Sequence, residues 1–85
     1  MTMIEKIAEK RSARRYKVLK GGTIAFGGNG IACTVRNLSS SGAAIDVPNT
    51  ASLPRSFMLI IEADDFIRRC HPVWHNESRV GVEFD

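Results

Sequence analysis

The sequence has no long hydrophobic run. Nowhere in its 85 residues is there an apolar stretch of about 18 residues, the length that a membrane-spanning helix needs. Residues 1–10 mix Glu and Lys with apolar residues and do not resemble a secretory signal. We therefore expect a cytoplasmic protein that does not insert into a membrane.

Cysteine is scarce. Cys33 and Cys70 are the two cysteines, too few for a disulfide scaffold, and we expect both to be buried thiols. Cys70 and His71 are adjacent, so in a strand they would point to opposite faces and could not bind one zinc ion. We expect no metal and no cofactor.

Catalytic signatures are also missing. Ser39–Ser41, Asp46 and His75 supply the residue types of a hydrolase, but no Gly-x-Ser-x-Gly nucleophile elbow is present. A chain of 85 residues forms one domain, which excludes a large multi-substrate enzyme. These observations predict a protein that is not an enzyme.

Positive charge is concentrated at the N-terminus. The net charge is +3, but residues 1–20 carry seven basic and two acidic side chains, whereas the rest carries five basic and seven acidic ones. A basic cluster beside a slightly acidic body indicates an anionic partner at one place. We divide the chain into an N-terminal arm, residues 1–15, which is flexible or forms a short helix, and a β-domain over residues 16–85.

Short alternating segments fill the β-domain. In one of them Ile31, Cys33 and Val35 are expected to face inward, whereas Thr34 and Arg36 face outward. Strands are predicted over residues 16–26, 31–36, 43–47, 57–61, 67–75 and 80–84. About six short strands separated by turns are typical of a small antiparallel β-barrel.

Glycine and proline mark the irregular points. The first strand is expected to be interrupted at Gly21-Gly22, and Gly27-Gly28-Asn29-Gly30 predicts a hairpin turn. Pro72 lies inside a predicted strand, which indicates an edge or a bulge. We assign Trp74 to the core or to the rim of the barrel rather than to a surface on which bases stack.

Two short motifs carry candidate binding chemistry. Arg11 and Arg15 form an Arg-x-x-x-Arg motif, with Arg14 between them. Guanidinium groups bind phosphate through paired hydrogen bonds, recognise the O6/N7 edge of guanine and stack on bases. Asn37-x-Ser39-x-x-Gly42 lies between two predicted strands. Its amide and hydroxyl can hydrogen-bond a guanine edge or a phosphate, while glycine permits positive φ and close backbone approach.

The order of these motifs resembles the PilZ domain family. The resemblance covers residues from about 11 to 84 and rests on Arg11, Arg15, Asn37, Ser39, Gly42, Val73-Trp74 and the closing Gly81-x-x-Phe84. It implies a six-stranded barrel that binds the bacterial second messenger cyclic di-GMP.

The resemblance implies a role for each motif. Arg11 and Arg15 would contact guanine and phosphate, with Arg14 beside them. A register shifted to Lys10 and Arg14 is the alternative, but the Arg15-Tyr16-Lys17-Val18 run enters the first strand as the family does.

In the second motif, Asn37 and Ser39 would read a guanine edge, and Gly42 would shape the turn. Asn37 stands where the family often has Asp, so the amide can bond to guanine but lacks the charge. Binding would order the arm against the barrel, and a downstream protein would recognise the new surface.

Two alternatives remain open. A single-stranded nucleic-acid binder would fit a small basic barrel, but we expect most of the aromatic side chains to face inward or to lie in turns, so stacking surfaces would be missing. A PilZ-like adaptor that binds no nucleotide and acts only through a protein partner is the second alternative.

Overall fold

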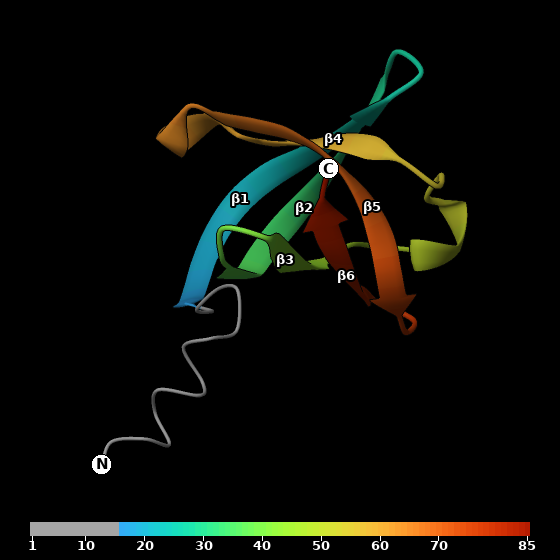
Figure 1. Cartoon of the computed structure of the whole chain (residues 1–85). Coiled ribbons are helices and arrows are strands. Elements are labelled where there is room, and N and C mark those ends of the chain that lie inside the picture. The colour runs from blue at the N-terminus through green and yellow to red at the C-terminus, as the bar shows by residue number, and fades with distance from the viewer. Residues whose placement is uncertain (1–15) are drawn as a thin grey trace.

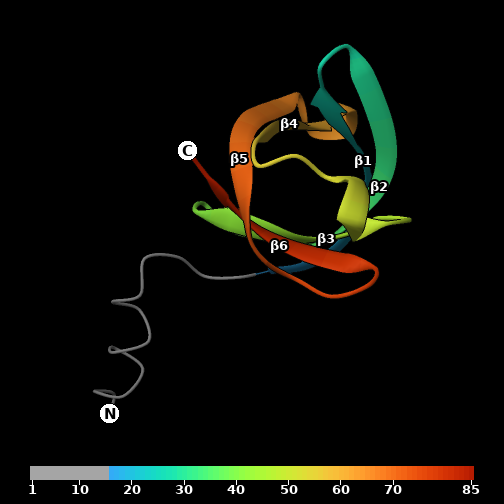
Figure 2. The same cartoon turned by 90° about the vertical axis from the view of Figure 1, so that its right-hand side faces the viewer.

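The fold is a closed antiparallel β-barrel (Figures 1 and 2). The computed structural model describes residues 16–85. Within that range six strands are joined in the order β1-β2-β3-β6-β5-β4, with β1 pairing β4 to close the ring. The strands are β1 (Tyr16–Phe26), β2 (Asn29–Leu38), β3 (Gly42–Asp46), β4 (Phe57–Ile61), β5 (Phe66–His75) and β6 (Arg79–Phe84). The predicted all-β, six-stranded barrel is confirmed.

Alternating side chains build the core. Val35, Ile45, Leu59 and Val80 are fully or almost fully buried and come from four different strands. The strand pattern with period two places every second residue inside, as the sequence predicted for β2 and β6. Short 3₁₀ turns, η1 (Thr50–Ser52) and η2 (Glu62–Asp64), occupy two of the connections. In the described part of the chain, no helix is long and apolar enough to cross a membrane.

The two thiols belong to this core. Cys33 and Cys70 are buried and free, as predicted. Burial raises the pKa of Cys33 to about 11 and that of Cys70 to about 12, the latter also through Asp85 and Cys33. Both sulfurs are therefore protonated and act as small apolar groups at neutral pH.

The β1–β2 hairpin turns where predicted, but β1 is not interrupted at its glycines. Gly27 and Gly28 take φ values of +52° and +81°, which suit the tight turn. The irregularity in β1 instead lies between Lys17 and Lys20. Gly22 stays paired in the β1–β2 ladder. A Cβ at this position would lie 3.0 Å from the carbonyl oxygen of Ile60, so glycine here allows the backbone of β4 to approach closely and does not interrupt β1.

Two further bulges change which side chains face outward. On β5 the register shifts between Pro72 and Trp74, which confirms the bulge expected at Pro72. On β2 it shifts between Val35 and Asn37, so Arg36 is the extra residue. This second bulge was not expected from the sequence, and it determines the position of Asn37.

Candidate functional site

A continuous row of residues crosses the outside of the barrel. Lys17 on β1 pairs with Asn37 on β2, Asn37 with Ala44 on β3, Ala44 with Gly81 on β6, and Gly81 with Trp74 on β5. Directly opposed residues in neighbouring strands share one face of the sheet. The row therefore has a cation at one end, an indole at the other and small residues between them.

The bulge at Arg36 places Asn37 in this row. Val35 is fully buried, so strict alternation would turn Arg36 outward and Asn37 inward. The extra residue instead pairs Asn37 with Ala44, which lines the outer groove and does not belong to the core cluster. As a result, Arg36 and Asn37 both lie on the outer face, next to each other.

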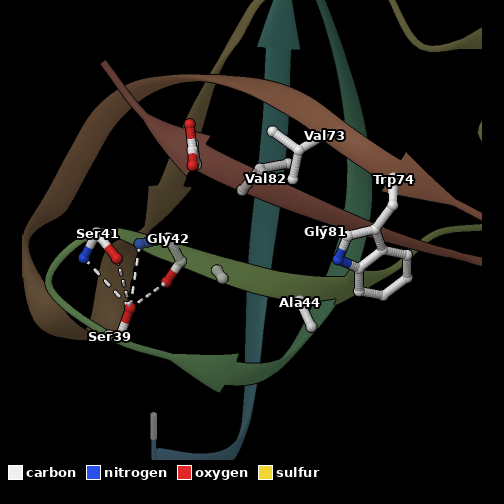
Figure 3. Close-up of a pocket in the computed structure, with 10 residues that line it drawn as sticks. Ser39, Ser41, Gly42, Ala44, Val73, Trp74, Gly81 and Val82 are labelled. Atoms are coloured by element: carbon white, nitrogen blue, oxygen red, sulfur yellow. Dashed lines mark hydrogen bonds between the residues drawn. The ribbon is translucent and has the colours of Figure 1, made fainter. Parts of the chain in front are cut away.

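Trp74 covers Gly81 on the outer face (Figure 3). Trp74 is 45% exposed, and its ring lies over Gly81 and toward Ala44. A Cβ at residue 81 would overlap the indole, so only glycine allows this position of the ring. Of the two predicted places for Trp74, the core was wrong, because the bulge on β5 turns this residue outward.

A shallow groove lies beside the indole. It has a volume of about 220 Å³, with Trp74 and Val73 on one side and Ser39 and Ser41 on the other, and Glu83 also lines it. Its floor is the backbone and small side chains of β3 and β6, as Figure 3 shows. The groove combines polar groups with the exposed ring of Trp74, which suits a planar ring carrying hydrogen-bonding groups.

Ser39 holds the turn between β2 and β3. Its Oγ accepts hydrogen bonds from the backbone N–H groups of Ser41 (3.2 Å) and Gly42 (3.1 Å) and donates to the carbonyl of Gly42 (3.2 Å). The Ser39 N–H also donates to the Gly42 carbonyl, at 2.9 Å. A hydroxyl has one donor and two acceptor positions, so these local bonds use its full capacity.

Gly42 allows β6 to approach. It pairs with Glu83, and a Cβ at residue 42 would overlap the backbone carbonyl of Val82. Close backbone approach is thus the role of Gly42. Of the two properties that glycine permits at this position, positive φ is not used, because Gly42 lies at the start of β3 and its φ is not positive.

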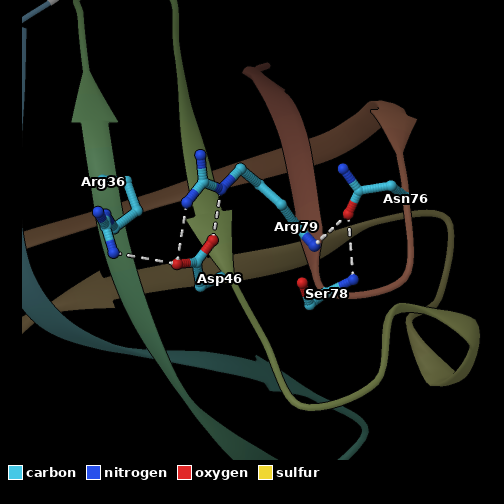
Figure 4. Close-up of polar contacts among 5 residues, drawn as sticks. All are labelled: Arg36, Asp46, Asn76, Ser78 and Arg79. Carbon is cyan, nitrogen blue, oxygen red and sulfur yellow. Dashed lines mark hydrogen bonds and ion pairs between the residues drawn. The ribbon is translucent and has the colours of Figure 1, made fainter.

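A charged cluster borders the row on the side opposite the Ser39 turn. Figure 4 shows its members, Arg36, Asp46 and Arg79. Arg79 donates to Asp46 through Nε (2.5 Å) and Nη2 (3.2 Å), and Arg36 donates to the same carboxylate through Nη1 at 3.4 Å. The hydrogen bond from Arg79 lowers the pKa of Asp46, with the nearby positive charges of Arg79 and Arg36 adding to it. Two guanidinium groups thus share one carboxylate.

The comparison with protein families decides what this barrel is. The model of the PilZ domain matches residues 9–85, almost the entire chain. The chain belongs to the PilZ domain family. PilZ is a cyclic di-GMP-binding domain family, and its members are generally non-catalytic receptors. Among curated proteins, no match was found.

The predicted arginine motif of this PilZ domain precedes the described residues. Arg11, Arg14 and Arg15, and the alternative register through Lys10, lie outside the described residues. Arg15 directly precedes Tyr16, the first residue of β1, in the sequence. The next residue, Lys17, is the first member of the outer row.

The second motif is brought together, with different tasks for its members. Asn37 stands in the outer row, whereas Ser39 and Gly42 lie at the turn beside it and line the groove. Sequence reasoning missed Trp74 as part of this site. The available signal was the combination of Pro72, which marks a bulge, with a glycine at residue 81 on the next strand.

The residue types considered for catalysis are separated. Ser41 precedes β3 and Asp46 ends it, so the two lie about 16 Å apart along the strand. The Asp46 carboxylate is also engaged by Arg79. Among residues 16–85, no group of three or more His, Cys, Asp or Glu side chains is placed to hold a metal ion.

His71 lies between two carboxylates, next to Glu83 at the edge of the groove. His71 Nδ1 is 2.7 Å from Asp85 Oδ1, and Nε2 is 3.4 Å from Glu83 Oε1. The hydrogen bond to Asp85 raises the pKa of His71, and the charges of Asp85 and Glu83 raise it further. His71 in its protonated form partly balances Glu83, the acidic residue that lines the groove.

Proposed function

We propose that this PilZ domain is a non-catalytic cyclic di-GMP receptor that binds its ligand on the outer row of the barrel. The arm supplies Arg11, Arg14 and Arg15, and the barrel supplies Asn37 together with the Ser39–Gly42 turn. Ligand binding orders the arm against the barrel, and a downstream protein recognises the combined surface of arm and ligand.

The proposal rests mainly on the position at which the arm meets the outer row. Lys17 pairs directly with Asn37, so the arm enters the barrel at one end of the row. The row crosses five strands, about 19 Å at a strand spacing of about 4.8 Å. Arg11 lies six positions before Lys17, and an extended chain of that length reaches about 20 Å. Every arginine of the motif can therefore reach the row.

The groups along the row complement a guanine dinucleotide. Guanidinium groups bind phosphate, and the Asn37 amide can both donate to and accept from a guanine edge. Trp74 offers an exposed ring against which a base can stack, a contact worth about 1–3 kcal/mol per base. Ser39 supports the proposal indirectly, because its hydroxyl holds the turn that lies beside Asn37.

The barrel surface favours this ligand over single-stranded nucleic acid. Phe26, Phe57, Phe66 and Phe84 belong to the core or pack against it, as expected for most of the aromatic side chains, whereas Tyr16 and Trp74 are exposed. Tyr16 and Trp74 lie on two different strands, β1 and β5, however. Residues 16–85 carry seven basic and seven acidic side chains, so the barrel has no net charge. Non-specific strand binding requires a positively charged groove, which a barrel without net charge does not supply.

The test is an NMR titration with cyclic di-GMP. The sequence holds a single tryptophan, so Trp74 gives one indole N–H signal that reports on the groove. We expect this signal and those of residues 10–17 and 37–42 to shift, with cyclic di-AMP as the control of equal charge. A folded protein whose spectrum stays unchanged at tens of micromolar ligand would refute the proposal.

Variants locate the contacts. Arg15→Ala is expected to weaken binding by about 1–3 kcal/mol, as for a bidentate contact to guanine or phosphate. Asn37→Ala is expected to weaken it as well, whereas Asn29→Ala, at the other end of the same strand, is the matched control. Tight, salt-dependent binding of mixed oligonucleotides would instead support the nucleic-acid alternative.

A further inference from the structure

We infer that Arg36, which stands beside the Asp46–Arg79 ion pair and adds a positive charge in excess of it, is an additional phosphate-binding residue next to the groove. The inference rests on the proposed function, because it names one more contact to the same anionic ligand. The group that Arg36 would bind is a phosphate of a cyclic dinucleotide.

The bulge on β2 is the first argument. It brings Arg36 and Asn37, which are consecutive, to the same outer face of the barrel. Consecutive Cα atoms are about 3.8 Å apart. A ligand that contacts the Asn37 amide therefore lies within reach of the Arg36 side chain.

The hydrogen bonds of the cluster are the second argument. Arg79 binds Asp46 through two nitrogens, whereas Arg36 makes one contact at 3.4 Å, the long limit for a hydrogen bond. A guanidinium has five N–H donors, so most of those on Arg36 are not used by Asp46. The Arg36 side chain is also 44% exposed.

The charge of the cluster is the third argument. Two guanidinium groups meet one carboxylate, which leaves one positive charge in excess. The Asp46–Arg79 pair lies two residues along the strands from the Ala44–Gly81 pair, about 7 Å from the floor of the groove. The excess charge therefore stands next to the groove and favours an anionic group there.

The test compares two arginine variants. Arg36→Ala removes the inferred contact, whereas Arg69→Ala removes an arginine that also makes one exposed contact at 3.4 Å, to Ser56 on the β4 side of the barrel. Both variants change the net charge equally. We expect Arg36→Ala to weaken cyclic di-GMP binding about tenfold, as for loss of a charge-assisted hydrogen bond, while Arg69→Ala stays within about twofold of the parent.

Asp46→Asn provides a test in the opposite direction. Removing the carboxylate charge leaves Arg36 uncompensated, so affinity is expected to rise severalfold and to depend more steeply on salt. The gain should vanish in the Arg36→Ala/Asp46→Asn double variant. A double variant that keeps the gain would assign the contact to Arg79 and overturn the inference.

Failure of the inference is distinguishable from failure of the proposed function. If the parent protein binds cyclic di-GMP and Arg36→Ala binds equally well, the inference is wrong and the receptor function stands. If the folded parent does not bind, the receptor function itself is wrong. Thermal unfolding of each variant shows that it is folded, and loss of an exposed ion pair should change stability little.

Discussion

Replacing Gly81 by alanine should displace Trp74 from the outer surface of the barrel. A Cβ at this position would overlap atoms of the indole, which lies over Gly81 and beside Ala44. The added Cβ would meet a ring that belongs to the neighbouring strand, β5. The backbone of Gly81 is paired with β3 on one side and β5 on the other, which holds it in position. The ring must therefore rotate away from the groove, while β6 stays in place.

The magnitude follows from the exposure of Trp74. The residue is 45% exposed, so about half of its area is buried. For a tryptophan this is about 100 Å², worth about 2.5 kcal/mol at about 25 cal/mol per Å². Alanine recovers about 0.5–1 kcal/mol relative to glycine in a strand. The net loss is about 1.5–2 kcal/mol, which corresponds to a fall in Tm of about 6–15 °C for a domain of this size.

The assay uses the single tryptophan as its own reporter. Fluorescence of the Gly81→Ala variant should be quenched more strongly by acrylamide than that of the parent, and its Tm should be lower. Gly21→Ala is the matched control, because Gly21 also lies in a strand but nothing is within 4 Å of the position of its Cβ. The control variant should keep the parent's quenching and should not lose stability.

Equal behaviour of the two alanine variants would refute the reasoning. In that case the indole would not depend on the absence of a side chain at residue 81. Under the proposed function, Gly81→Ala should also weaken cyclic di-GMP binding, because the groove loses the side that Trp74 forms.

Two further predictions concern titratable groups. Because burial holds the pKa of Cys33 at about 11 and that of Cys70 at about 12, neither thiol should react with Ellman's reagent at pH 8 until the barrel unfolds, and rapid reaction of the native protein would contradict their burial. The pKa of His71 is raised in the folded state, so its stabilising effect is complete below the unfolded value of about 6.5 and is lost as pH rises through the folded value. The Tm difference between the parent and His71→Gln should therefore shrink from pH 6 to pH 8, and a constant difference would show that the carboxylates of Asp85 and Glu83 do not act on this ring.

Much of the architecture could be predicted from local patterns. The alternation of Ile31, Cys33 and Val35 with polar residues sets which face of β2 is buried, and the Gly27-Gly28 pair supplies the positive φ values of the hairpin. Both signals act within a few residues, so they are readable without knowing the partner strands.

The role of Ser39 was less accessible to prediction. A hydroxyl between two strands is chemically suited to a ligand, and the sequence does not distinguish this role from a local one. The structure shows its bonds to Ser41 and Gly42, which hold the turn. Serine competes for nearby backbone groups wherever the chain bends, and the bend itself depends on the pairing of β2 with β3.

The sequence alone determined that this chain forms a barrel of short antiparallel strands and that its basic residues gather near the N-terminus, because alternation, turn residues and charge are local properties. Only the tertiary structure decided that Asn37 and Trp74 share one outer row. Strand bulges at Arg36 and beside Pro72 turn these residues outward. A bulge arises from the register between strands, and register is settled when the whole barrel closes.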